Sequence, residues 1–92
     1  MKEKVIETCG KIWHELGSRG RANVDDLSDA IKEDEEMVNL ALGWLAREDK
    51  IECAPNRHGR MFSLVESELK AFRSVYGDVK PRKRSIWSRL LR

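Results

Sequence analysis

The chain has 92 residues, a length that fits one small domain, and 37% of its residues are charged. No apolar run reaches the roughly 18–20 residues that a membrane-spanning helix needs, and the charged start of the chain is unlike a signal peptide. The two cysteines, Cys9 and Cys53, are too few for a disulfide framework, so we expect a cytoplasmic protein.

The net charge of +2 combines two unlike parts of the chain. Residues 1–78 contain 12 Lys and Arg against 16 Asp and Glu, which gives −4. Residues 79–92 contain six basic residues and no acidic one. Because nucleic-acid binding depends largely on neutralising phosphates, most of the capacity for it lies in this basic tail.

The first predicted element is an amphipathic helix over residues 2–16, where apolar residues recur at helical spacing. Gly17 follows at the place where a helix C-cap favours a residue that tolerates positive φ. A polar connector over residues 18–23 leads to Val24, which we expect to form a brief strand.

The second predicted helix begins at Asp25, a residue type that serves well as an N-cap. Its buried side is expected to contain Leu27, Ala30 and Ile31. A short acidic turn then separates it from the third helix, so the two helices form a helix-turn-helix pattern.

The third predicted helix covers residues 35–48, with Asp34 as its N-cap. At 100° per residue its apolar arc spans about 200°, although a half-buried helix usually needs an arc nearer 100°. The side expected in the core contains Val38, Ala41, Leu42 and Leu45. A second strip, which something else should cover, contains Met37, Leu40 and Trp44.

Two short strands follow, over residues 50–54 and 61–65, around a basic, glycine-containing turn over residues 55–60. Two strands after a helix-turn-helix form a wing. The predicted fold is therefore mainly α with a small β-wing: a winged helix-turn-helix with a three-helix core, a two-stranded hairpin and an additional C-terminal helix.

The expected organisation has three parts. Residues 1–65 form the winged helix-turn-helix domain. Residues 66–77 form a helix, capped by Ser67 and ended by Gly77, that packs on the domain or on a dimer partner. Residues 78–92 form the basic tail, for which the sequence leaves order and disorder open.

Three stretches resemble a small winged helix-turn-helix family of bacteria and archaea: KEKVIETCGKIWHELG, NVDDLSDAI and above all ALGWLAREDKI. The resemblance covers about residues 1–65. It implies the winged-helix fold, a homodimer and DNA binding without a defined target, and it supplies no catalytic motif. The fourth helix and the tail lie outside it.

The third helix is the expected DNA reader, because base contacts in the major groove need polar side chains on the exposed arc of such a helix. Only Asn39 and Arg47 on that arc suit this role, and Glu35 and Glu36 would oppose phosphates. Further phosphate contacts are expected from the wing and the tail, through Arg57, His58, Arg60, Lys80, Arg82, Lys83 and Arg84.

These basic segments also have other interpretations. The wing tip is equally consistent with an ordinary solvated turn. The tail is consistent with a solubilising end, an anionic-membrane contact or a ligand for an acidic protein groove, although it has too few apolar residues for much membrane insertion.

The strip of Met37, Leu40 and Trp44 is predicted to form a homodimer interface together with Phe72 and Tyr76. The alternative is that the chain's own fourth helix covers the strip, through Leu69, Phe72 and Tyr76.

No arrangement of residues predicts a metal site, a cofactor or catalysis. Cys9 and His14, like Cys53 and His58, are five residues apart. On a helix this spacing points Cys9 and His14 about 140° away from each other, and structural zinc sites typically use tighter spacings. We expect both cysteines to be small buried apolar residues.

The sequence therefore predicts a weakly specific DNA-binding protein with a regulatory role, which is not an enzyme and has no evident small-molecule substrate. The alternative is a homodimeric protein-interaction module that uses the winged-helix fold without binding DNA. The acidic balance of residues 1–78 favours the second interpretation, and the basic tail favours the first.

Overall fold

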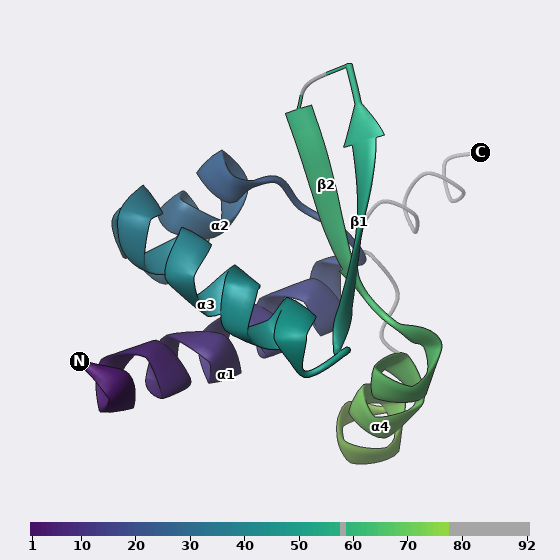
Figure 1. Cartoon of the computed structure of the whole chain (residues 1–92). Helices are drawn as coiled ribbons and strands as arrows, with labels where there is room; N and C mark the ends of the chain where they lie inside the picture. Colours follow the sequence, from purple (N-terminus) through teal and green to yellow (C-terminus); the bar gives the residue numbers. More distant parts are fainter. Residues whose placement is uncertain (58, 78–92) are drawn as a thin grey trace, which may run out of the picture.

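The computed structural model describes residues 1–57 and 59–77, and these residues form four helices and one antiparallel hairpin (Figure 1). Among them, no helix is both long and apolar enough to cross a membrane. The elements are α1 (Lys2–Arg19), α2 (Val24–Ile31), α3 (Glu35–Arg47), β1 (Ile51–Asn56), β2 (Gly59–Leu64) and α4 (Glu66–Tyr76).

The core lies between the first three helices, the root of the wing and α4. All four residues of α3 predicted to be buried are buried, and Phe72 of α4 joins the same cluster. The buried apolar residues are Val5, Cys9, Ile12, Leu16, Ala22, Leu27, Val38, Ala41, Leu42, Leu45, Ile51, Leu64 and Phe72.

Helix α1 is one turn longer than predicted, and Gly17 is not its C-cap. The helix continues to Arg19 and ends at Gly20, whose φ of 95° is the conformation that glycine adopts easily. Gly17 has a different role, because a Cβ built on it would lie 2.2 Å from Cδ1 of Phe72. The glycine makes room for the aromatic ring of α4 on the surface of α1.

The start of α2 also differs from the prediction. The N-cap is Asn23, whose side chain accepts a hydrogen bond from the backbone N–H of Asp26 at 2.8 Å, so the assignment of Asp25 was wrong. Val24 is the first residue of the helix and not a strand. The strand-like residue is Ala22, which exchanges backbone hydrogen bonds of 3.0 and 2.8 Å with Phe62 of the wing.

The buried side of α2 was predicted in part. Leu27 is buried and Ile31 is half-buried, but Ala30 is exposed, because it lines an open hollow beside α1 and does not enter the core. After Lys32, which takes a left-handed φ of 60°, Asp34 caps α3 as predicted and accepts from the N–H of Met37 at 2.9 Å.

The turn between α2 and α3 is attached to α1 by charge. The Glu33 carboxylate lies 2.7 Å from Nζ of Lys4 and 4.0 Å from Nζ of Lys11. The backbone carbonyl of Glu33 accepts a hydrogen bond from the hydroxyl of Ser28.

The wing is longer than predicted, because β1 runs to Asn56 and β2 begins at Gly59, directly opposite it. Pro55 lies inside β1, which is possible because β1 is an edge strand that pairs only with β2 among the described residues. Among the described residues of the wing, only the root residues Ile51 and Leu64 are buried in the core, and Phe62 packs partly against it. Cys53 is exposed, contrary to expectation.

Helix α4 packs on α1 and β2, and it begins one residue before Ser67, with Val65 as its N-cap. The Phe72 ring is 2% exposed and lies 5.4 Å from the Trp13 ring, centroid to centroid. The indole N–H of Trp13 also donates to Oε1 of Glu68 at 2.8 Å. Gly77, with φ of 84°, ends the helix as predicted.

The close contact between Gly17 and Phe72 leads us to predict that a larger residue at position 17 destabilises the fold. Gly17→Ala should lower the free energy of unfolding by about 1–3 kcal/mol, because the new methyl group overpacks the ring. The control is Gly10→Ala in the same helix, where a Cβ would meet nothing within 4 Å. Gly10→Ala should be stabilising by about 0.5–1 kcal/mol. Urea denaturation measures both, and equal effects of the two substitutions would contradict the packing role of Gly17.

Candidate nucleic-acid interface

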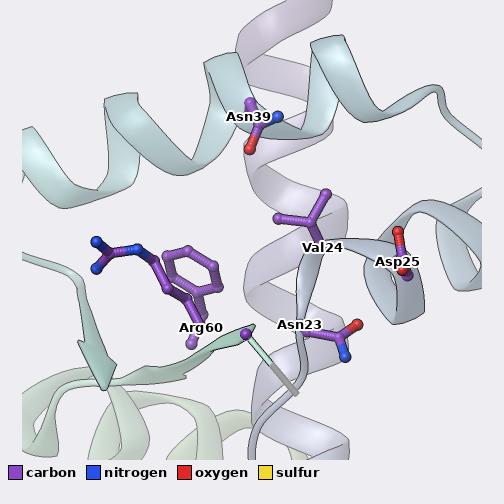
Figure 2. A pocket seen from close by; sticks show the side chains of 7 residues that line it. Asn23, Val24, Asp25, Asn39 and Arg60 are labelled. Atoms are coloured by element: carbon purple, nitrogen blue, oxygen red, sulfur yellow. The ribbon is translucent and has the colours of Figure 1, made fainter. Parts of the chain in front are cut away.

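A pocket of about 280 Å³ opens between the start of α2, the middle of α3 and the wing (Figure 2). Three elements that are distant in sequence supply its walls. Figure 2 shows Asn39 of α3, Val24 of α2 and Arg60 of the wing gathered around the same opening. The lining residues are Asn23, Val24, Asp25, Asn39, Gly59, Arg60 and Phe62. We call this pocket the wing groove.

Local structure places each of these side chains. The bridge between Ala22 and Phe62 holds the N-cap of α2 beside the wing. Arg60 is the second residue of β2. It follows Gly59, which begins the strand with a φ of 104°. The Arg60 guanidinium donates to Sγ of Cys53, on the neighbouring strand, at 3.6 Å.

The structure brings together two of the predicted contact residues, Asn39 and Arg60. Arg47 is exposed at the end of α3 and Arg57 is exposed at the end of the wing, and neither lines the groove. The other predicted contacts lie outside the described residues: His58, Lys80, Arg82, Lys83 and Arg84.

Sequence reasoning missed Asn23, Val24 and Phe62 as members of this site. Asn23 could have been found from the sequence, because asparagine is as good an N-cap as aspartate and Asn23 lies two residues before Asp25. Phe62 had none, since its place beside α2 depends on a backbone bridge between segments 40 residues apart.

Acidic residues border the groove. Asp25 lines it, and the first turn of α3 contains Glu35 and Glu36. A side-chain hydrogen bond with Asp25 raises the pKa of Glu35 above its usual value, and the negative charges of Asp25 and Asp29 raise it further. These carboxylates suit the helix N-termini, and their negative charges would repel a phosphate backbone at this edge of the groove.

The residues of the predicted dimer interface differ in their exposure to solvent. Leu40 and Trp44 are 41% and 36% exposed, and Met37 is half-buried against the core. Phe72 is buried inside the monomer against α1, so its assignment to an interface was wrong. Tyr76 is exposed, but its ring contacts the tilted ring of Phe72 and, edge to face, the ring of His14 of α1, with ring centroids 4.7 and 4.9 Å away.

The alternative, in which α4 covers the strip, is also wrong. Helix α4 packs on α1 and β2, and Figure 1 shows it below the base of the wing. Its one buried residue, Phe72, makes its aromatic contacts with α1 and with Tyr76. The strip of Leu40 and Trp44 therefore remains open in the described monomer.

The two cysteines have different environments. Cys9 is buried, its thiol donates to the carbonyl of Ala41 at 3.5 Å, and burial raises its pKa against the opposing charge of Lys50. Within residues 1–57 and 59–77, no group of three or more His, Cys, Asp and Glu is arranged to hold a metal ion.

The carboxylate pair makes a prediction about pH. The pKa of Glu35 is higher in the folded state than in the unfolded state. The Glu35–Asp25 pair therefore stabilises the fold most at a pH below the pKa of an unfolded glutamate. This stabilisation is lost as the pH rises through the pKa of Glu35 in the folded state. A carbon-detected NMR titration should show Glu35 with a pKa above that of an ordinary glutamate. Asp25→Asn should lower that pKa, because it removes the largest cause of the shift. Asp26→Asn is the control and should leave the pKa of Glu35 where it is; a shift unaffected by Asp25→Asn would contradict the pairing.

Comparison with known proteins agrees with this fold. A double mutant of ZitR from Lactococcus lactis, in apo form, superimposes with a TM-score of 0.68 over 98% of this chain and 77% of that chain, at 14% identity. An uncharacterised protein of Methanocaldococcus jannaschii (MJ1608) is 40% identical over 50 residues, which are 52% of this chain and 71% of the relative. Residues 1–64 match the family described as the winged helix-turn-helix domain (DUF2582), and the chain belongs to that family.

Proposed function

We propose that the protein binds duplex DNA weakly and with modest specificity, through the wing groove and its basic tail, in a regulatory role. The observation that carries this proposal is that Asn39 and Arg60 line one opening between the third helix and the wing. An amide on the third helix suits a base edge, and an arginine on the wing suits a phosphate or a narrow minor groove.

The charge distribution supports weak binding. Residues 1–78 have a net charge of −4, and the basic residues of the tail add the positive charge that phosphate neutralisation requires. Asp25, Glu35 and Glu36 at the helix starts disfavour a deep major-groove insertion of α3. The wing side of α3 is thus the better place for contact.

Fluorescence anisotropy with duplex DNA over a salt series tests this proposal. Asn39→Ala should weaken specific binding by about 1–3 kcal/mol. Arg60→Ala should lower the slope of log affinity against log salt concentration by about one. Lys70→Ala, which removes an exposed charge from α4, is the control and should leave both quantities nearly unchanged.

A second variant separates the groove from the tail. Replacing Lys80, Arg82, Lys83 and Arg84 by Gln should reduce affinity for every duplex to a similar extent, since phosphate contacts are independent of sequence. If this variant alone loses binding, while Asn39→Ala and Arg60→Ala bind as the wild type does, the wing groove is not the DNA site.

A second candidate function is protein association through α3, in a homodimeric interaction module. The observation that favours it is the exposure of Leu40 and Trp44, two large apolar residues one helical turn apart on a helix that is otherwise well packed.

Trp44→Glu tests this candidate. A charge at the centre of an apolar interface should convert a dimer into a folded monomer, because the carboxylate would be buried without a partner. Sedimentation velocity gives the mass, and far-UV circular dichroism reports the fold. A dimer that survives the substitution would place the contact elsewhere, and an unfolded product would identify Trp44 as part of the monomer core.

A further inference from the structure

The wing groove combines three kinds of chemical surface in about 280 Å³, and their combination indicates which base pair it suits. Its floor is apolar, because Val24 and Phe62 are half-buried against the core and their exposed parts line the groove. An amide, Asn39, lies beside this floor, and a cation, Arg60, lies on the wing side. Figure 2 shows the Asn39 amide directed from α3 towards the opening, next to Val24.

The Asn39 amide is available to a ligand. Within residues 1–57 and 59–77, no hydrogen bond engages the side chain of Asn39. The amide of Asn23, in contrast, already accepts from the backbone N–H of Asp26 as the cap of α2. Asn39 therefore presents a donor and an acceptor side by side. Among the four bases, adenine alone offers the matching pair in the major groove, because its N6 amino group donates and its N7 accepts.

The apolar floor suits the base that pairs with adenine. Thymine presents a methyl group at C5 in the major groove, and apolar side chains are the protein groups that contact it there. Val24 and Phe62 supply such a surface beside the amide. An A·T pair thus satisfies both the amide and the floor of one groove.

A G·C pair fits the groove less well. Guanine presents two acceptors, which suit a guanidinium or an ammonium group. Arg60 is the one cation among the lining residues that the structure describes, and it already donates to Sγ of Cys53 on the neighbouring strand. Cytosine presents an amino group that a carboxylate can accept, but the carboxylates of Asp25 and Glu35 hydrogen-bond to each other. Cytosine also has no methyl group for the apolar floor.

We infer that the wing groove reads an A·T base pair in the major groove. Asn39 binds N6 and N7 of the adenine, and Val24 with Phe62 contacts the 5-methyl group of the thymine in that pair or in the adjacent one. This inference rests on the DNA binding proposed above and adds to it the identity of the bases. Arg60, at the edge of the groove, contacts the phosphate backbone and contributes no base preference.

Base analogues test the inference with the full chain, by fluorescence anisotropy with short duplexes of equal length at one salt concentration. An alternating A–T duplex should bind about five- to hundredfold more tightly than an alternating inosine–cytosine duplex, the range expected for one bidentate base contact. Inosine lacks the 2-amino group of guanine, so its pair with cytosine resembles A·T in the minor groove and G·C in the major groove. This pair of duplexes therefore separates base reading by Asn39 from a minor-groove preference of Arg60.

Two smaller changes to the A–T duplex assign the individual contacts. Replacing adenine by 7-deazaadenine removes the N7 acceptor and should weaken wild-type binding about fivefold, the contribution of one hydrogen bond. Replacing thymine by uracil removes only the methyl group and should weaken binding about three- to fourfold, the contribution of one buried methyl group. Asn39→Ala should abolish the first difference, and Val24→Ala should reduce the second. Val75→Ala, the same substitution at an exposed position on α4, is the matched control and should preserve both differences.

Two results would overturn the inference and leave the proposed function in place. One is equal affinity for the A–T and inosine–cytosine duplexes, and the other is binding to the A–T duplex that neither base analogue weakens. Absence of binding to every duplex, even at low salt, would overturn the proposed function and this inference together. Far-UV circular dichroism verifies that each variant is folded.

Discussion

The pair of backbone hydrogen bonds between Ala22 and Phe62 is the constraint on which the candidate site depends. A two-stranded hairpin alone is only marginally stable in water, and here it gains a third backbone partner and a fully buried alanine. Asn23 follows directly and caps α2, so the bridge fixes the start of that helix against the wing. The wing groove forms because the backbone bridge at Ala22 and the helix cap at Asn23 belong to adjacent residues.

Helix α3 presents three surfaces at once. Val38 and Leu45 face the core, Asn39 faces the wing groove, and Leu40 with Trp44 faces solvent beyond the core. A helix with 3.6 residues per turn can separate three such faces within 13 residues, but each is then narrow. This division explains why the helix has an apolar arc wider than its monomer uses, and why few polar positions remain for reading DNA.

The acidic helix starts reflect a conflict between folding and binding. Asp34 and the first-turn acids stabilise the N-terminus of α3 through capping and the helix dipole. The same charges repel phosphates at the end of the helix that would otherwise approach DNA first. In the proposed function, DNA contact is therefore expected on the wing side of α3, where Arg60 lines the wing groove.

The sequence by itself determined the winged-helix architecture, the cap at Asp34, the buried side of α3 and the two wing strands, because each follows from local spacing and capping chemistry. It also indicated Asn39 and Arg60, each separately, as candidate DNA contacts. Only the tertiary structure decided that these two meet, that Gly17 receives Phe72 and that α4 leaves the strip on α3 open. Those outcomes depend on contacts between residues about 20 to 55 positions apart, and periodicity and propensity contain no information about which distant faces come together.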